Sequence, residues 1–512
     1  MIRINSALIS NERLTVLAAI ALGVFSLVVV FSYHNIADGD LWARFAQGAS
    51  IWKAGHLIQK DIFAFTPVLP EYVDHEWGSG LIFFSLLKIF GPGSLLLFKI
   101  ITACGAIFFA VKAARINNVK WPTILFVAIP CALAVFPGYI PVVRSHTLTY
   151  LFFAAMLFYL EKIRQGDARP AITILFIMLI WVNVHGGFVS GLGIIAVYAL
   201  MDLLFKRPSK IMLVTLMGAV FATTINPYGL KFWDCLLKAL TLHRDSIAEW
   251  QAMPFFGQDP YLGFRILFAI VIFILILGRK GFKGKKSVTQ LVVLAITAFI
   301  AIKHRRHAPF FGLAALAFLG PYLEACAARL KLRITALIAV AAYTLIAILV
   351  AISILPLVTF QVLAPVGFYP VREADILMYS KAEGNLAVPL RWGNYAMWRL
   401  YPRIKISMCG RYEAMYPQST FDMNHDFFFK NGDNWDRMTK LCKVDYIMLE
   451  LNNTALKPED LNALGFENIW SSRYSALYVR KELAPALVAA ARNLPSKTIQ
   501  PLDAHIIDSW KM

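Results

Sequence analysis

The chain has 512 residues, of which 58% are hydrophobic and only 16% are charged. Soluble domains carry about 25% charged residues, so this composition excludes an ordinary soluble protein. It predicts an α-helical polytopic membrane protein whose partner is the lipid bilayer. The net charge of +19 is typical of nucleic-acid-binding proteins. The positions of the basic residues argue against a nucleic-acid partner, because they follow the membrane topology.

Apolar runs recur along the first two thirds of the chain. A helix that crosses about 30 Å of hydrocarbon needs roughly 20 apolar residues. About 11 runs approach this length, several of them short, and we expect transmembrane helices near 14–32, 93–111, 122–138, 147–160, 171–182, 188–205, 211–225, 263–278, 288–302, 309–323 and 334–356. A further run at 81–90 is too short to span. It predicts a helix that lies along the interface or packs against the bundle.

Basic residues gather in alternate connections between these runs. They lie at the N-terminus and at 112–120, 162–169, 206–210, 279–286 and 329–333. Cytoplasmic loops of membrane proteins are enriched in Lys and Arg. We therefore expect a cytoplasmic N-terminus, with the other connections on the extracytoplasmic side. The first apolar run is longer than the core of a signal peptide, and no small-residue cleavage site follows it, so we expect a retained first helix.

The chain divides into two predicted domains. Residues 1–356 form the transmembrane domain, which includes a first outer loop at 33–78. Residues 357–512 carry more charge and no membrane-length run. In this tail, β-type runs at 386–390, 446–449 and 476–479 alternate with helical ones at 371–381, 434–442 and 457–463. The pattern predicts a small extracytoplasmic α/β domain that packs against the outer end of the bundle.

The first outer loop contains the candidate catalytic acids. Asp38 and Asp40 follow the first apolar run, and a carboxylate at a membrane–water boundary can act as a general base or hold a cation. We favour Asp40 as the base, near the start of a helix that contains Trp42; the alternative is a plain helix cap. Glu76 is a second candidate acid or metal ligand, beside His75, which is suited to contact a phosphate. No metal-site spacing is present, and a divalent metal remains possible.

Cations and histidines occupy the other outer segments. Arg makes bidentate contacts to phosphate, and a His followed by two glycines lets the backbone approach a ligand. A basic cluster at 303–307 breaks the positive-inside pattern with no acid beside it in sequence; either the local topology differs or the cluster binds an anion. The candidate phosphate-binding residues are His75, Arg144, His146, His185, Lys303, Arg305 and Arg306.

The order of these motifs resembles the bacterial multi-span glycosyltransferases of the GT-C superfamily, and among them the dolichyl-phosphate-mannose mannosyltransferase-like group. The resemblance covers most of the chain and rests on Asp38-x-Asp40-x-Trp42, Asp61-x-Phe63-x-Phe65-Thr66, His75-Glu76-Trp77, Arg144-x-His146, Trp181-x-Asn183-x-His185-Gly186-Gly187, Asn226-Pro227-Tyr228-Gly229, Glu249-Trp250, Arg306-His307-x-Pro309, Trp392-Gly393-Asn394-Tyr395 and Gly410-Arg411-Tyr412-Glu413. The chain departs from the family pattern at two positions. Arg44 stands where a His is usual, and Cys409 stands where an Asp is usual.

The resemblance implies a GT-C-like bundle, a polyprenyl-phosphate sugar donor, an inverting transfer and a catalytic base in the first outer loop. On this chain the base is Asp40 or Asp38. The expected protein is a membrane glycosyltransferase of the bacterial inner (plasma) membrane that glycosylates an envelope glycan, lipid or protein at the outer face. Two alternatives remain: a transporter or flippase of a lipid-linked or anionic solute, and a non-catalytic envelope assembly protein.

Overall fold

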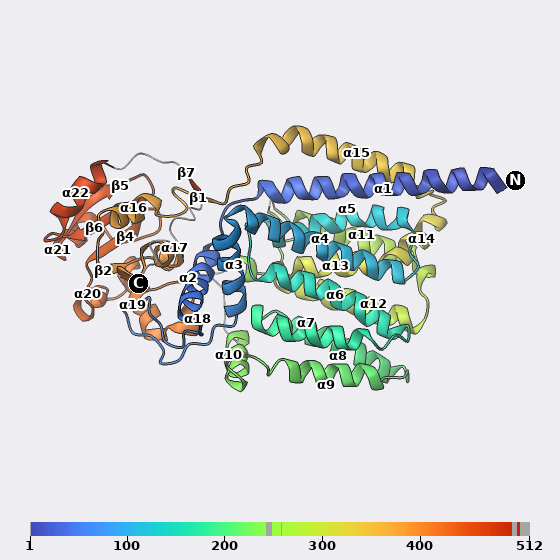
Figure 1. Cartoon of the computed structure of the whole chain (residues 1–512), viewed down its shortest axis with the longest axis horizontal. Coiled ribbons are helices and arrows are strands. Elements are labelled where there is room, and N and C mark those ends of the chain that lie inside the picture. The colour runs from blue at the N-terminus through green and yellow to red at the C-terminus, as the bar shows by residue number, and fades with distance from the viewer. Residues whose placement is uncertain (1, 242–247, 258, 494–498, 502–512) are drawn as a thin grey trace.

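The computed structural model describes residues 2–241, 248–257, 259–493 and 499–501. A bundle of roughly parallel and antiparallel helices occupies one side of the molecule, and an α/β part occupies the other (Figure 1). A helix of the first outer loop and the helix that follows this loop stand between them. This arrangement is compatible with the predicted helical membrane protein that has a small sheet-containing part.

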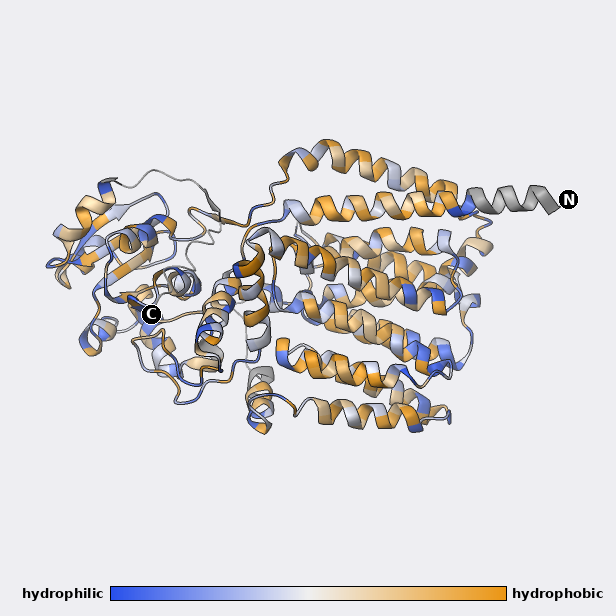
Figure 2. Ribbon diagram, viewed as in Figure 1, coloured by the Kyte–Doolittle hydropathy of each residue, from blue (hydrophilic) through white to orange (hydrophobic). Residues whose placement is uncertain are grey.

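Helices occur at every predicted span. They are α1 (Ile2–Tyr33), α4 (Gly93–Ile116), α5 (Trp121–Val135), α6 (His146–Arg164), α7 (Pro170–Val184), α8 (Phe188–Leu204), α9 (Lys210–Ala222), α11 (Leu262–Leu277), α12 (Lys285–Lys303), α13 (Ala308–Phe318), α14 (Gly320–Arg329) and α15 (Ala336–Ser353). Hydrophobic residues, coloured orange, make up most of the bundle (Figure 2). The helix positions are therefore confirmed.

Not all of these helices have the length and hydropathy of a membrane span. Within the described residues, five helices are long and apolar enough to cross a membrane, and they correspond to α1, α4, α5, α12 and α15. A sixth span results if α13 and α14, bent by 62° at their junction, are counted as one. Helices α7, α8, α9 and α11 are apolar but shorter. The count of about 11 spans stays a prediction.

Small residues pack the centre of the bundle. Helix α4 buries Ala103, Ala106, Ala110 and Ala113 completely, and it packs along α6. Small side chains let helices approach closely, which supplies the van der Waals contact that drives association in lipid. Every residue of α13 is buried, so this helix forms the middle of the bundle.

Helices α2 (Gly39–Ala54) and α3 (Trp77–Phe90) lie across one end of the bundle (Figure 1). They cross at two glycines: a Cβ on Gly48 would lie 2.1 Å from the carbonyl oxygen of Gly80. Only glycine permits so close an approach. The short apolar run at 81–90 is thus the second half of α3, packed between α2 and the bundle.

The tail forms a five-stranded mixed sheet in the order β3-β2-β4-β6-β5. Strand β2 is parallel to β3 and β4, whereas β6 is antiparallel to β4 and β5. The strands are β2 (Gly384–Ala387), β3 (Ile404–Ile406), β4 (Tyr446–Glu450), β5 (Phe466–Ser471) and β6 (Ser475–Arg480). A separate antiparallel pair joins β1 (Leu363–Pro365) to β7 (Ile499–Pro501).

The tail helices surround this sheet. They are α16 (Val371–Tyr379), α17 (Leu390–Leu400), α18 (Tyr412–Met415), α19 (Gln418–Phe429), α20 (Arg437–Leu441), α21 (Pro458–Ala463) and α22 (Ala484–Asn493). Each predicted strand and helix of the tail overlaps an observed element, with shifts of a few residues at the ends. The prediction of an α/β fold is confirmed for the described part of the tail.

The first outer loop belongs structurally to the α/β part as much as to the bundle. Its backbone bridges Ile36 to Leu363 and Ala64 to Ile406. The indole of Trp42 in α2 packs edge-on against the rings of Tyr369 and Tyr395, at centroid distances of 5.5 and 5.1 Å. The core that holds α2 in place is therefore built largely by the tail.

Candidate functional site

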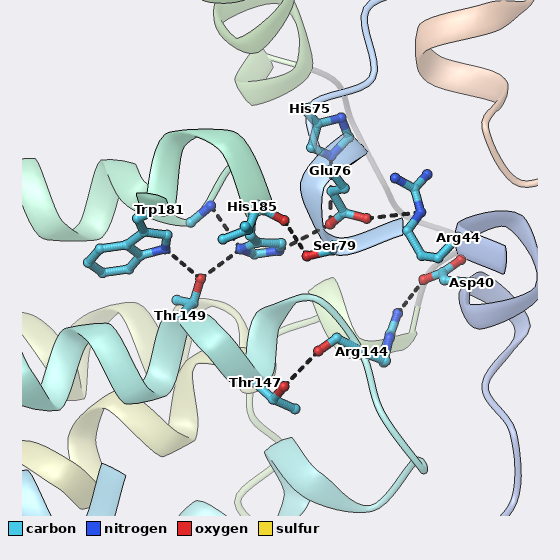
Figure 3. A network of polar contacts seen from close by, with 12 residues as sticks. Asp40, Arg44, His75, Glu76, Ser79, Arg144, Thr147, Thr149, Trp181 and His185 are labelled. Atoms are coloured by element: carbon cyan, nitrogen blue, oxygen red, sulfur yellow. Dashed lines mark hydrogen bonds and ion pairs between the residues drawn. The ribbon is translucent and has the colours of Figure 1, made fainter. Parts of the chain in front are cut away.

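Arg144 lies at the centre of a charged cluster at the end of the bundle where α2 and α3 lie. It precedes α6, and its guanidinium contacts three carboxylates from two other segments. The distances are 3.2 Å from Nε to Asp38 Oδ1, 2.7 Å from Nη2 to Asp40 Oδ2 and 2.9 Å from Nη1 to Glu249 Oε2. Figure 3 shows the contact to Asp40. The Arg144 side chain is only 18% exposed, so these contacts are partly shielded from water.

Glu249 joins Arg144 to the basic segment that follows α12. Arg306 Nη1 lies 3.3 Å from Glu249 Oε1, and the Arg306 guanidinium covers the Trp250 ring at 4.5 Å. Burial opposes ionisation of Glu249, but the two guanidiniums outweigh it and hold its pKa at about 2. The sequence placed no acid beside Arg306; the fold supplies one from a distant segment.

Asp38 and Asp40 have different surroundings. Asp38 is the N-cap of α2, and its Oδ1 accepts a 2.9 Å hydrogen bond from the backbone N–H of Asp40. Burial raises the pKa of Asp38 to about 6, with Arg144 opposing the shift and Asp40 adding to it. The Asp40 side chain is 55% exposed, against 20% for Asp38. Asp38 is the helix cap, and Asp40 is the carboxylate open to an incoming molecule.

Glu76 forms a second charged cluster beside the first. Its carboxylate lies 3.4 Å from His185 Nε2, 3.5 Å from Arg44 Nε and 3.9 Å from His75 Nε2 (Figure 3). Arg44 also donates a 2.7 Å hydrogen bond to Asp74. Burial favours the neutral form of Glu76, but the cationic neighbours, Arg44 foremost, outweigh it and hold the pKa at about 2.

His185 is held in one orientation at the C-cap of α7. Its Nδ1 accepts from the backbone N–H of Gly187 at 2.9 Å and lies 2.7 Å from the Thr149 hydroxyl. That hydroxyl in turn accepts from the Trp181 indole at 2.9 Å. Because Nδ1 is an acceptor, the ring proton is on Nε2 and points to Glu76. Burial lowers the pKa of His185 to about 4, so the ring is neutral at neutral pH.

The other residues predicted to contact phosphate take a smaller part in the Arg144 and Glu76 clusters. His146 Nε2 lies 3.0 Å from the Gly138 carbonyl, which fixes its ring 6.5 Å from that of His185. The Arg305 guanidinium lies over the Tyr261 ring at 5.7 Å. Lys303 is exposed at the C-terminal end of α12, and His75 is 44% exposed. These residues share the same end of the bundle, and Arg306 is the one of them that joins the Arg144 cluster.

Asp40, Glu76, Arg144 and His185 form two contacting pairs at this end of the bundle. Asp40 contacts Arg144, Glu76 contacts His185, and the charge of Arg144 acts on both Glu76 and His185. Three members of the site were not assigned from the sequence. Glu249 stands out in the sequence only as part of the Glu249-Trp250 motif, Arg44 only as a departure from a family pattern, and Thr149 has no sequence signal.

The arrangement provides fixed cations next to ionised carboxylates, with a neutral imidazole among them. Such a site can bind an anionic group and accept a proton from a hydroxyl. Among the described residues, no group of three or more His, Cys, Asp or Glu side chains is placed to hold a metal ion; the divalent metal stays a prediction. No protein-family model matches the chain, and no curated protein matches it.

Proposed function

We propose that the protein is a membrane glycosyltransferase that moves a sugar from a polyprenyl-phosphate carrier to a hydroxyl of an envelope glycan, lipid or protein. The observation that supports this function best is the contact of Arg144 with Asp38, Asp40 and Glu249. A guanidinium, a group suited to bind phosphate, thus lies beside a candidate base at the end of an apolar bundle. A lipid-linked phosphosugar fits both features, since its lipid stays in the bilayer while its phosphate reaches this end.

In the proposed reaction the donor phosphate replaces carboxylate oxygens on the guanidiniums of Arg144 and Arg306. Loss of the Arg144 contact frees Asp40 to accept the proton of the acceptor hydroxyl. The hydroxyl oxygen forms a bond to the anomeric carbon from the face opposite the phosphate. The bond from that carbon to the phosphate oxygen breaks, and its electron pair stays on the phosphate, whose charge the arginines stabilise. The product has the inverted configuration.

Glu76 acts as an accessory carboxylate in this scheme. Its carboxylate holds the Nε2–H of His185 and the guanidinium of Arg44 in place. His75, Lys303 and Arg305 then add donors and positive charge around the phosphate or the sugar. His185 and His146, which are held by hydrogen bonds within the protein, shape the wall of the site. The proposed setting is a bacterial plasma membrane with the N-terminus cytoplasmic and the α/β part extracytoplasmic.

Single replacement of the two aspartates tests the mechanism. Purified protein with Asp40→Asn or Asp38→Asn is given radiolabelled undecaprenyl-phosphate sugars and an envelope extract as acceptor. We expect Asp40→Asn to lower turnover by about 10²–10⁴-fold, the usual contribution of a general base. Asp38→Asn should have a smaller effect, through the start of α2.

The matched control is Glu71→Gln, in the same loop. Glu71 is 67% exposed and pairs with the exposed Lys231, so its loss should leave turnover unchanged. Full turnover in both aspartate variants contradicts the mechanism. Movement of the labelled carrier across a vesicle bilayer with its sugar–phosphate bond intact would support the transporter alternative instead.

A further inference from the structure

A second charged site lies at the opposite end of the bundle from Arg144. A cavity of about 350 Å³ opens there between the ends of α6, α8, α9 and α12. Its lining includes Arg164, Gly166, Asp202, Arg207, Ile211 and Lys286. Hydrophilic residues gather at this end of the bundle (Figure 2). The volume is within the range of about 300–1,000 Å³ that small-molecule sites occupy.

The cavity wall carries more positive than negative charge. Three cationic side chains line it, from Arg164, Arg207 and Lys286, against the single carboxylate of Asp202. Asp202 Oδ1 lies between the two guanidiniums, 3.7 Å from Arg164 Nε and 3.5 Å from Arg207 Nη1. Both separations exceed a normal hydrogen bond of about 2.7–3.2 Å. One carboxylate thus serves two arginines without bonding closely to either.

Glu161 lies behind the cavity and does not remove this excess. Its side chain is fully buried. Its oxygens accept from the Tyr198 hydroxyl at 2.7 Å and from Gln290 Nε2 at 3.0 Å. Lys286 Nζ and Arg164 Nη1 are farther away, at 3.6 and 3.5 Å. Neutral donors thus satisfy Glu161, and the Arg207 and Lys286 side chains of the lining remain 25% and 37% exposed.

Arg164 provides a second, independent observation. Its side chain is 4% exposed, and its Nη1 and Nη2 atoms are buried with no hydrogen-bond partner among the described residues. A buried charged donor without an acceptor is unfavourable, so native structures seldom contain one without a reason. The planar fork of a guanidinium matches the oxygens of a phosphate.

The geometry points to a phosphate-binding site formed by Arg164, Arg207 and Lys286 at this end of the bundle, separate from the Arg144 cluster. A phosphate group supplies several oxygen acceptors and the negative charge that the wall lacks. It can belong to a membrane phospholipid or be free inorganic phosphate. The exposed Leu203 and Leu204 on the neighbouring turn of α8 would allow acyl chains to lie beside a bound headgroup.

The site is tested by measuring how ligands change the stability of the full chain. The same measurement distinguishes a phospholipid headgroup from free inorganic phosphate. The protein is purified in a neutral detergent, and its unfolding midpoint is followed against inorganic phosphate, dioleoyl phosphatidylglycerol or dioleoylglycerol. The two lipids have the same acyl chains and differ by the phosphate-bearing headgroup. We expect a saturable rise with phosphatidylglycerol and none with dioleoylglycerol. A rise with phosphate as well shows that the phosphate group is sufficient, and a rise with phosphate alone assigns the site to the free ion.

Two variants locate the binding. Arg207→Gln is chosen because Arg207 is 25% exposed and its loss leaves the buried Arg164 in place. It should raise the apparent Kd about tenfold, which corresponds to one charge-assisted hydrogen bond. Lys280→Gln removes the same charge from an exposed residue at the same end, outside the lining, and should change the Kd less than about twofold. Equal losses in both variants, equal responses to the two lipids, or no saturable rise with any ligand would overturn the proposal.

Discussion

Arg411 donates a 2.8 Å hydrogen bond to the carboxylate of Asp61, although the two residues are 350 positions apart. Both side chains are almost fully buried, at 3% and 1% exposed. The pair joins the first outer loop to the α/β tail beside the bridge between Ala64 and Ile406. The loop that contains Asp38 and Asp40 is therefore positioned by residues from the far end of the chain.

Removing one member of this pair should destabilise the protein strongly. Asp61→Asn leaves the Arg411 charge buried without its counter-ion, a loss of about 3–5 kcal/mol in similar sites. We expect a lower unfolding midpoint, measured by a thermal melt in detergent. The control is Glu71→Gln, which breaks an exposed pair and should leave the midpoint unchanged. Equal midpoints for Asp61→Asn and wild type would show that the pair does not hold the loop.

A single methyl group at Gly187 should disturb His185. A Cβ there would lie 2.4 Å from Thr149 Oγ1 and 2.6 Å from His185 Nδ1, so these side chains must shift, and the His185–Glu76 contact changes with them. A displacement of about 1 Å can lower turnover by about 10²-fold, and we expect a loss of that size in the sugar-transfer assay. Gly193→Ala is the matched control, because that position has open space around it. Equal activity of the two variants would contradict a positioned His185.

Arg144 should not tolerate replacement by lysine. Lysine keeps the charge, but its single nitrogen cannot reproduce the fork that contacts Asp38, Asp40 and Glu249. In the proposed reaction, Arg144→Lys should lower kcat by about 10²–10³-fold, more than it raises KM. The control is Lys231→Gln, because Lys231 is an exposed residue that pairs with Glu71 of the first outer loop. A change in KM alone would assign Arg144 to ground-state binding rather than to the transferred phosphate.

The stability of the fold should depend on the ionisation of Asp38. Its pKa in the folded protein, about 6, is above the ordinary value of 3.8, so the folded state binds the proton more tightly than the unfolded state. The resulting stabilisation is complete below about pH 3.8 and is lost as the pH rises through about 6. Wild type should therefore lose stability relative to Asp38→Asn between pH 4 and pH 7, as measured by unfolding midpoints.

A second variant checks the cause of this pH dependence. Glu249 adds negative charge near Asp38 and opposes its ionisation. Glu249→Gln should therefore move the loss of stability to lower pH. A constant difference between wild type and Asp38→Asn across this range would show that Asp38 does not titrate there.

The helices and the two-part organisation could be predicted from the sequence because each is a local property. An apolar run long enough for a bilayer forms a helix whatever its neighbours are, since its backbone groups must bond within the segment. The short strands and helices of the tail could also be predicted from the sequence, because their residue patterns have periods of 2 and 3.6. The helix that begins after Asp38 was anticipated for the same reason, although Asp38 rather than Asp40 is its cap.

The site itself was predictable only in part. Asp40, Glu76, Arg144 and His185 were chosen by residue type and by their place in outer segments. Their pairing depends on contacts between residues about 100 positions apart, and no local pattern encodes those contacts. Glu249 shows the limit most clearly: it bonds Arg144 and Arg306 at once, yet in sequence it is one acid among several in a long loop.

The sequence by itself determined that this chain is a helical membrane protein with charged segments between its apolar runs, because hydrophobic burial is decided segment by segment. Only the tertiary structure decided which charges meet. Ion pairs need atoms within about 4 Å of each other, and that distance results from how Gly48 and Gly80 let α2 and α3 cross and how the tail holds the first loop.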